Sequence, residues 1–308
     1  MTLILPHTLG DTPYRLDTLL GSGAHGDVYR GRHVGLDKSV IIKLLRLTAE
    51  EAPQLADRMR LESQALARMK HPNLVDVSDS GVSGERPFFV MEDDKGHTLG
   101  EELRRRGKLP AGEAVALACD VLDGLSYVHA QGLVHRDIQP GNVLLHRPVG
   151  SKRLVARILD FGLLKLMADG QEASVGGELK PLIIPTADNT TVGTPAYMAP
   201  EQARGETVDA RSDIFSAACV LYEMLCGKSP FGHHPDMTTT LRAVVTEAHE
   251  PPSKHTREAG EELDAAMACA LEKTTAKRFA NAAAFATALR TAATADARRG
   301  AAGWPPRS

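Results

Sequence analysis

The chain has 308 residues, which at about 150 residues per domain predicts two lobes or two small domains. Lysine and arginine together number 36 and aspartate and glutamate 39, so the formal net charge is −3. This balance disfavours a nucleic-acid-binding protein, because such proteins usually carry a net basic surface. The composition also excludes collagen-like and disulfide-based proteins.

The cysteines and the apolar runs predict the cellular context. No two of the four cysteines form a C-x-x-C pair and each has apolar neighbours, which indicates buried, reduced thiols: Cys119, Cys219, Cys226 and Cys269. The longest apolar stretch, Ser216–Cys226, is too short for a bilayer span, which needs about 20 residues. The first residues lack the basic start of a signal peptide. We therefore expect a cytoplasmic protein with no membrane span.

The part of the chain before Gly96 predicts a small β-rich lobe. A period of three to four residues between apolar positions predicts one helix, Ala52–Met69. Strands are expected where β-branched and aromatic residues cluster: Tyr14–Leu20, Asp27–Arg32, Ser39–Leu45, Leu74–Ser80 and Phe88–Glu92. The first two strands flank a glycine-rich turn, and Gly81–Gly84 separates the last two.

After Gly96 the pattern becomes mainly helical. Helices are predicted at Ala111–Gln131, Asp213–Cys226, Thr239–Glu247, Glu261–Glu272 and Ala280–Ala292, and short strands at Asn142–His146 and Leu154–Leu159. A small β-rich lobe followed by a larger helical lobe is an α+β arrangement, with the hinge near Glu92–Gly96. The Ala/Arg/Gly/Pro-rich end, Thr291–Ser308, is expected to fray.

The glycine-rich turn has the spacing G-x-G-x-x-G-x-V from Gly21 to Val28. Glycines let a backbone approach a phosphate closely, although such a string is also typical of a flexible hairpin. Lys43 ends the run Val-Ile-Ile-Lys, and Glu62 lies in the middle of the predicted helix. Each alone fits a solvated side chain; together they predict an ion pair aimed at phosphates.

Three further segments carry the strongest signal, and they occur in a fixed order. They are His135-Arg-Asp-Ile-Gln-Pro-Gly-Asn142, Ile158-Leu-Asp-Phe-Gly162 and Gly193-Thr-Pro-Ala-Tyr-Met-Ala-Pro-Glu201. With the glycine-rich turn and Lys43, the chain resembles the eukaryotic-type protein kinase domain, specifically the serine/threonine kinases of bacteria. The resemblance covers Tyr14 to Leu289 and also includes Asp213-Ile-Phe-Ser and Lys277-Arg-Phe279.

The resemblance implies a bilobal protein-kinase-like fold. It divides the chain into an N-terminal extension at 1–13, an N-lobe at 14–92, and a hinge and C-lobe at 93–290. The activation segment would occupy 160–201, and 291–308 would form a flexible tail.

The resemblance also implies ATP and Mg²⁺ and assigns roles to single residues. Asp137 would accept or orient the proton of the substrate hydroxyl, and Lys43 would contact the α- and β-phosphates while Glu62 holds it. Asn142 and Asp160 would hold Mg²⁺. The implied nucleotide contacts are Gly21, Ser22, Gly23, Gly26, Val28, Ile41, Lys43, Glu62, Met91, Glu92, Asp94, Leu144 and Asp160.

Other matches imply structural roles. Asp213 would brace the backbone of the catalytic loop, and Glu201 would form a buried ion pair with Arg278. Three residues resemble a packed spine that links the lobes: Leu66, His135 and Phe161.

The long segment between Asp160 and Glu201 has two interpretations: a disordered insertion around Ala168–Asn189, or an activation loop that is phosphorylated. Arg136 favours the second, because in this family that arginine pairs with a loop phosphate. Thr194 is expected to contact Asp137. The candidate phosphorylation sites are Thr190, the first choice by its position, then Thr191 and Thr186.

Five residues depart from the family pattern. Gln139 stands where a lysine normally contacts the γ-phosphate, so a rate loss on the order of 10²-fold or more is expected. Ile41 replaces a small residue at the adenine ring, and Asp93-Asp94 replaces apolar hinge residues. Gly141 replaces an acidic residue that some family members use to select basic substrates.

We therefore predict a kinase that transfers the γ-phosphoryl group of Mg-ATP to Ser/Thr of proteins, including its own activation loop. Gln139 is included among the catalytic residues with Asp137, Lys43 and Asn142. A homodimer would support phosphorylation of one copy by another. The alternatives are a pseudokinase that acts as a nucleotide-binding or signalling scaffold, and, more distantly, a small-molecule phosphotransferase of kinase-like fold.

Overall fold

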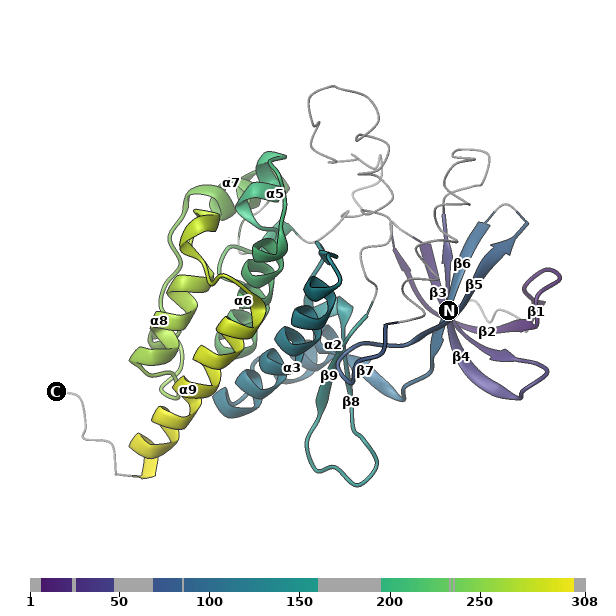
Figure 1. Cartoon of the computed structure of the whole chain (residues 1–308), viewed down its shortest axis with the longest axis horizontal. Coiled ribbons are helices and arrows are strands. Elements are labelled where there is room, and N and C mark those ends of the chain that lie inside the picture. The colour runs from purple at the N-terminus through teal and green to yellow at the C-terminus, as the bar shows by residue number, and fades with distance from the viewer. Residues whose placement is uncertain are drawn as a thin grey trace. The chain divides into compact units, whose positions relative to one another are not determined.

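A computed structural model describes residues 7–23, 26–46, 69–84, 86–159, 195–232, 234 and 236–301. The chain divides into two compact units, and the division falls between Lys95 and Gly96, inside the predicted hinge (Figure 1). The predicted helix Ala52–Met69, apart from its last residue, lies outside the described residues. So does most of the predicted activation segment, 160–194.

The first unit is built on one antiparallel sheet with the strand order β1-β2-β3-β4-β6-β5 (Figure 1). Its strands are β1 (His7–Thr8), β2 (Tyr14–Gly23), β3 (Gly26–His33), β4 (Lys38–Leu45), β5 (Val77–Ser83) and β6 (Arg86–Glu92). Successive side chains of a strand point to opposite faces, so the alternation along β4 gives the sheet a buried and a half-buried face. The buried side chains form one apolar core: Leu9, Tyr14, Leu16, Val40, Ile42, Leu44, Phe88 and Val90.

Two parts of this sheet differ from the prediction. His7 and Thr8 pair with Arg15–Leu16, and Leu9 is buried, so the described part of the predicted N-terminal extension belongs to the first unit. β5 begins at Val77 rather than Leu74 and runs through Gly81, which was expected to lie in a turn. In this strand Gly81 pairs with Phe88, and a glycine fits there because a Cβ would lie 2.8 Å from the nearest atom of the Phe88 ring.

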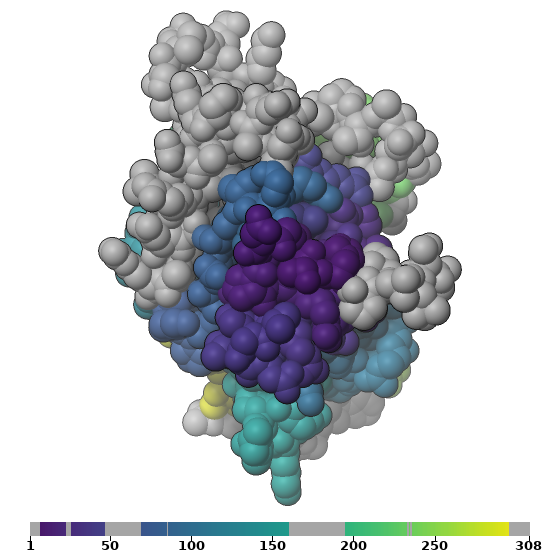
Figure 2. Space-filling model, turned by 90° about the vertical axis from the view of Figure 1, so that its right-hand side faces the viewer, coloured from purple at the N-terminus to yellow at the C-terminus, as the bar shows by residue number. Residues whose placement is uncertain are grey.

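The second unit is mainly helical, with a small sheet in the order β7-β8-β9. Its strands are β7 (Gly96–Thr98), β8 (Val143–His146) and β9 (Val155–Ile158). Its helices are α2 (Leu99–Arg106), α3 (Ala111–Ala130), α5 (Pro200–Arg204), α6 (Ala210–Cys226), α7 (Met237–Thr246), α8 (Glu261–Ala270) and α9 (Ala282–Ala301), with short 3-10 turns at 140–142, 195–197, 252–254 and 275–277. Figure 2 shows the hairpin between β8 and β9, in teal, projecting from the surface.

The core of the second unit lies between α3, α6 and α9, which pack against one another. α6 is almost entirely buried; Asp209 caps its first turn and Gly227 ends it with φ +74, a conformation that favours glycine. The cap at Asp209 explains why α6 begins at Ala210, before the predicted Asp213. Side chains from all three helices are fully buried, including Leu122, Phe215 and Phe285.

The last helix is longer than predicted. α9 continues to Ala301, so Thr291–Ala301 is helical rather than part of a frayed tail. The alanines and arginines of this stretch have high helix propensity and extend a helix already anchored by its buried first turns. Within the described ranges, no helix is both long and apolar enough to cross a membrane.

Candidate active site

The loop His135–Asn142 joins the region after α3 to β8, and a buried carboxylate holds it in place. Asp213, fully buried in α6, accepts hydrogen bonds from the backbone N–H groups of His135 at 2.8 Å and Arg136 at 2.7 Å. It also accepts one from His129 Nε2 at 2.8 Å. Arg136 has φ +63, an unfavourable region for a residue with a Cβ, and the brace compensates for this. The predicted brace is confirmed.

His135 connects the same loop to the strand that leads to Asp160. The N–H of Asp137 donates to His135 Nδ1 at 3.3 Å, so Nε2 carries the ring proton and donates to the carbonyl of Leu159 at 3.1 Å. The N–H of Leu159 in turn donates to the carbonyl of Asn142 at 2.8 Å. The end of β9 is therefore tied to both ends of the loop.

Asp137 and Asn142 lie side by side. Asn142 Nδ2 donates to the Asp137 carbonyl and to Asp137 Oδ2, both at 2.8 Å. Pro140 opens a 3-10 turn, and the N–H of Asn142 donates to the carbonyl of Gln139 at 2.9 Å. The sequence motif thus brings the predicted base and a predicted magnesium ligand into contact, with Gln139 on the same turn.

The remaining residues predicted in the second unit flank this turn. Leu144 is half-buried on β8, between the fully buried Val143 and Leu145, so it faces away from the core. Gly141 is exposed, and a Cβ built on it would meet no atom within 4 Å. This opening leaves room for a ligand or a substrate chain beside the catalytic loop.

In the first unit, the pairing of the strands places several of the predicted nucleotide residues on one face of the sheet. Gly21 pairs with Val28, and Val28 pairs with Lys43. Ile41 pairs with Met91, two residues along the same strands. Neighbours in register point to the same face, so Gly21, Val28 and Lys43 form one row across β2, β3 and β4, and Ile41 and Met91 form a second row on β4 and β6.

The glycine-rich turn is anchored by an ion-pair cluster around Asp27. Ser22 Oγ donates to Asp27 at 2.7 Å, and Arg46 and Arg86 each place a guanidinium nitrogen 3.1 Å from its carboxylate. Burial raises the pKa of Asp27, but these hydrogen bonds outweigh it and the pKa is lowered. Gly26 has φ +146, and its Cβ would lie 2.3 Å from the carbonyl of Leu44, so only glycine fits.

The acidic residues at the end of β6 have partners in the same unit. Lys38 Nζ lies 3.0 Å from Glu92, and Asp93 accepts from Ser39 Oγ at 2.6 Å and Arg30 Nε at 3.2 Å. These contacts explain how Asp93 is tolerated where the family usually has an apolar residue. Asp94 is half-buried.

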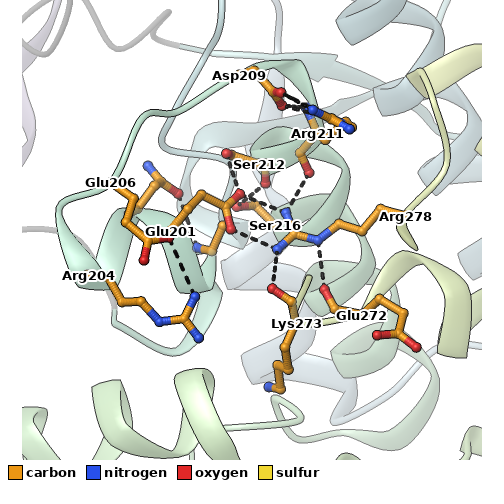
Figure 3. Close-up of polar contacts among 12 residues, drawn as sticks. Glu201, Arg204, Glu206, Asp209, Arg211, Ser212, Ser216, Glu272, Lys273 and Arg278 are labelled. Atoms are coloured by element: carbon orange, nitrogen blue, oxygen red, sulfur yellow. Dashed lines mark hydrogen bonds and ion pairs between the residues drawn. The ribbon is translucent and has the colours of Figure 1, made fainter. Parts of the chain in front are cut away.

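The predicted Glu201–Arg278 pair is confirmed, and it is buried and bidentate (Figure 3). Both guanidinium nitrogens lie 2.7 Å from the carboxylate, and Ser212 Oγ donates to Glu201 at 2.5 Å. Arg278 also donates to the carbonyls of Glu272 and Arg211. Burial raises the pKa of Glu201, but the bonds from Arg278 and Ser212 outweigh it and the pKa is lowered.

One contact near the loop has no counterpart in the sequence-based prediction. Gln202 receives the N–H of Ala199 at 3.1 Å and donates to the carbonyl of Arg136 at 3.0 Å, so it ties α5 to the catalytic loop. The sequence could have indicated Gln202 only through its position directly after Glu201. A single glutamine does not predict a hydrogen bond to a residue 66 positions earlier in the chain. Tyr197 OH donates to Glu223, another unpredicted contact.

Several predicted functional residues lie outside the described residues. They are Glu62, Asp160, Thr186, Thr190 and Thr191, together with Leu66, Phe161 and Thr194. Gly23 is described only in its backbone. The contact expected between Lys43 and Glu62 therefore stays a prediction.

A glycine-anchored antiparallel sheet, followed by helices that brace a His-Arg-Asp loop through a buried aspartate, defines the class of protein kinase domains. The chain belongs to this family: the model of the protein kinase domain matches residues 14–289. Its relatives place it in the bacterial serine/threonine kinase branch.

Among these relatives is PknB, a serine/threonine-protein kinase of Mycolicibacterium smegmatis, 35% identical over 90% of this chain. A probable PknB of Bifidobacterium longum is 34% identical over 94%. The chain spans 42% and 41% of these proteins, about two fifths of their lengths. PknL of Mycobacterium bovis is 34% identical over 92% of the chain and 67% of that protein.

A solved structure, a double mutant of the PknI kinase domain from Mycobacterium tuberculosis, has the same fold. The TM-score is 0.70 at 25% identity, and the match covers 93% of this chain and 99% of that one.

Proposed function

We propose that this chain transfers the γ-phosphoryl group of Mg-ATP to serine or threonine hydroxyls of proteins, with Asp137 as the residue that orients the acceptor. The observation that carries the proposal is the contact of Asn142 with the carbonyl and the carboxylate of Asp137, both at 2.8 Å. It supports a carboxylate held in one orientation, which proton acceptance from a substrate hydroxyl requires.

The donor set also suits magnesium. Because Asn142 directs its Nδ2 at Asp137, its amide oxygen is left as the donor to a cation, and amide and carboxylate oxygens are ligands that Mg²⁺ accepts. Asn142 and Asp160 would hold the ion, which supplies charge neutralisation on the phosphates. Lys43, on the same face as Gly21 and Val28, would bind the α- and β-phosphates.

The remaining nucleotide contacts follow the register of the first unit. Ile41 and Met91 are paired on neighbouring strands; Ile41 would pack on the adenine ring and Met91 would border the pocket behind it, with the backbone at Glu92 and Asp94 beside the ring. Leu144, turned away from the core of the second unit, is the nucleotide contact predicted in that unit. Ser22 contributes indirectly, because its hydroxyl holds Asp27 and so shapes the glycine-rich turn.

Regulation would act through Arg136. Its backbone is fixed by Asp213 and its guanidinium is half-buried, so burial lowers its pKa. A phosphate on Thr190, Thr191 or Thr186 would supply the opposite charge and order the activation segment. Modification by a second copy of the chain requires a transient homodimer.

The test is incubation with Mg-ATP followed by intact-mass measurement, after dephosphorylation of the purified protein. Transfer to the chain's own threonines adds one or more phosphate masses. The Asp137→Asn variant is the matched control, and it should stay unmodified because it keeps the size of the side chain but loses the base. Equal phosphate incorporation in both proteins would refute the role of Asp137.

Gln139 distinguishes the kinase from the pseudokinase alternative. If glutamine in place of lysine limits the reaction, Gln139→Lys should raise the rate on the order of 10²-fold, because it restores a charged contact to the γ-phosphate. An unchanged rate would remove Gln139 from the catalytic residues. ATP-dependent thermal stabilisation without transfer in either protein would favour the scaffold.

A further inference from the structure

The residue directly before the proposed base has a strained backbone. Arg136 has φ +63, a region that is unfavourable for a residue with a Cβ. Such a conformation persists only where the surrounding contacts fix the backbone. On one side of the residue, the N–H of Arg136 donates to the buried Asp213 at 2.7 Å. On the other side, the carbonyl of Arg136 belongs to the peptide unit that leads into Asp137, and a different residue fixes it.

That residue is Gln202 in α5. Its Nε2 donates to the carbonyl of Arg136 at 3.0 Å in a partly buried hydrogen bond. The N–H at the other end of the same peptide unit, that of Asp137, donates to His135 Nδ1 at 3.3 Å. Both polar groups of this peptide unit are therefore held by side chains. Because the plane of the unit sets the position of the Asp137 Cα, Gln202 and His135 together fix the point from which the carboxylate extends.

The helix that carries Gln202 is a rigid platform for this contact. The adjacent Glu201 side chain is only 3% exposed and pairs with the fully buried Arg278. Gln202 itself is half-buried, and its Oε1 accepts the N–H of Ala199, the N-cap residue of α5, at 3.1 Å. Each end of the Gln202 amide thus has a separate partner, one in the helix and one in the catalytic loop.

The capping contact alone does not require an amide. Glutamate and glutamine serve equally at the third position of a helix, because either side chain can accept the N–H that the first turn leaves unpaired. Only glutamine also offers N–H donors on the same side chain. The group that distinguishes Gln202 from a glutamate is therefore its Nε2, which is the atom directed at the catalytic loop.

We propose that Gln202 is a positioning residue for Asp137: it holds the Arg136 carbonyl and so fixes the peptide unit that carries the catalytic carboxylate. The inference rests on the proposed function, since it places the substrate hydroxyl at Asp137. A displacement of about 1 Å in a catalytic group lowers the rate on the order of 10²-fold. Because the contacts of Asp213 and Asn142 remain when Gln202 is changed, we expect a smaller loss, on the order of tenfold.

Gln202→Glu in the full chain is the decisive substitution. It keeps an acceptor for the N–H of Ala199, but it places a carboxylate oxygen against the Arg136 carbonyl, where no hydrogen bond can form. With a threonine peptide, kcat should fall on the order of tenfold, while KM for ATP and for the peptide and the melting temperature stay unchanged. Gln202→Met loses both contacts, so it should show the same fall in kcat together with a lower melting temperature.

Gln131→Glu is the matched control. Gln131 is an exposed glutamine at the end of α3, shortly before the catalytic loop, and in the described part of the chain its side chain makes no hydrogen bond. This variant adds the same charge without touching the Arg136 carbonyl, and it should keep its kcat. The pH profile of kcat/KM gives a further check. In Gln202→Glu the plateau should fall while the acidic limb keeps its position, because the geometry of Asp137 changes and its pKa does not.

Amide hydrogen exchange of the segment 135–142, measured without nucleotide, gives a readout that does not depend on transfer. Exchange in this segment should be faster in Gln202→Glu than in the wild type, with exchange in α5 unchanged. If the wild type transfers no phosphate but exchange responds in this way, the proposed function alone is contradicted. Full activity of Gln202→Glu would show that only the cap matters and would overturn the role of Gln202. An equal fall in kcat in Gln131→Glu, or a shifted acidic limb with an unchanged plateau, would overturn it as well.

Discussion

The charges near the catalytic loop and those near the glycine-rich turn are stabilised in opposite ways. In the second unit, Asp213 is fully buried, and the Glu201 and Arg278 side chains are 3% and 0% exposed. In the first unit, the cluster around Asp27 lies at the surface, with 51% of the Arg46 side chain exposed. Buried charges that lose a partner are strongly destabilised, whereas exposed pairs contribute little.

This difference indicates how the candidate site residues of each unit are held in position. The catalytic loop owes its geometry to a few buried polar contacts between residues far apart in the chain. The residues of the first unit predicted to contact the nucleotide owe their geometry mainly to backbone pairing in the sheet, and the surface ion pairs contribute less. Single substitutions should therefore have large effects in the first case and small effects in the second.

The largest effect is expected for Arg278→Met, which leaves Glu201 buried without its cation. We expect a loss of about 3–5 kcal/mol in the free energy of unfolding, measured by urea denaturation. Arg211→Met is the control, because its pair with Asp209 is 35% and 45% exposed and should contribute less than about 1 kcal/mol. Equal losses in the two variants would contradict the comparison.

The second largest effect is expected for Asp213→Asn, which should lower the activity of the protein rather than prevent its folding. The amide can accept from one backbone N–H but not from both, so the loop around Arg136 loses its fixed position. A displacement of about 1 Å in a catalytic group lowers kcat on the order of 10²-fold. Steady-state kinetics with a peptide substrate checks this, and an unchanged kcat at full folding would show that the brace is dispensable.

Glu102→Gln should have an intermediate and pH-dependent effect. Burial raises the pKa of Glu102, but hydrogen bonds from Arg105, Arg106 and His97 outweigh it and lower the pKa to about 2. Because the folded-state pKa is below the unfolded one, the carboxylate stabilises the fold above about pH 4.5, and this is lost as pH falls toward 2.

The free energy of unfolding of the wild type should accordingly exceed that of Glu102→Gln by on the order of 2 kcal/mol at pH 7. This difference should vanish near pH 2. Thermal melts of both proteins across this range measure it. Glu113→Gln, whose ion-pair partner among the described residues is Arg106, should show a smaller difference. A difference in stability between the wild type and Glu102→Gln that does not change with pH would indicate that the variant loses packing contacts rather than a charge interaction.

The smallest effect is expected for Arg46→Ala at the glycine-rich turn. Arg86 still contacts Asp27, so the free energy of unfolding should fall by less than about 1 kcal/mol, and high salt should reduce the difference further. Arg32→Ala, which removes an exposed pair with Asp37, is the comparison. A fall of several kcal/mol in the free energy of unfolding would mean that the glycine-rich turn depends on its ion pairs as strongly as the catalytic loop does.

Much of the fold and of the candidate site was predictable from the sequence. The periods of the apolar residues located the strands β2, β3, β4 and β6 and the helices α3, α6, α7, α8 and α9, and the ordered motifs identified the family. Asp213 and the Glu201–Arg278 pair were expected because the motifs name those positions. The sequence predicted the ends of elements less well than their existence. The strand β1, the start of β5 and the end of α9 depend on contacts with neighbouring elements, and the spacing of apolar residues carries no information about those contacts.

What the sequence by itself determined is therefore the order of the main elements and the family, and it supplied the candidate residues for the chemistry. These features follow from the spacing of apolar residues and from short motifs, both of which involve residues that are close together in the chain. Only the tertiary structure decided which charges are compensated: Asp93 beside Ser39 and Arg30, and the buried Glu102 beside Arg105 and Arg106. The reason is physical, because an ion pair depends on separations of a few ångströms between side chains.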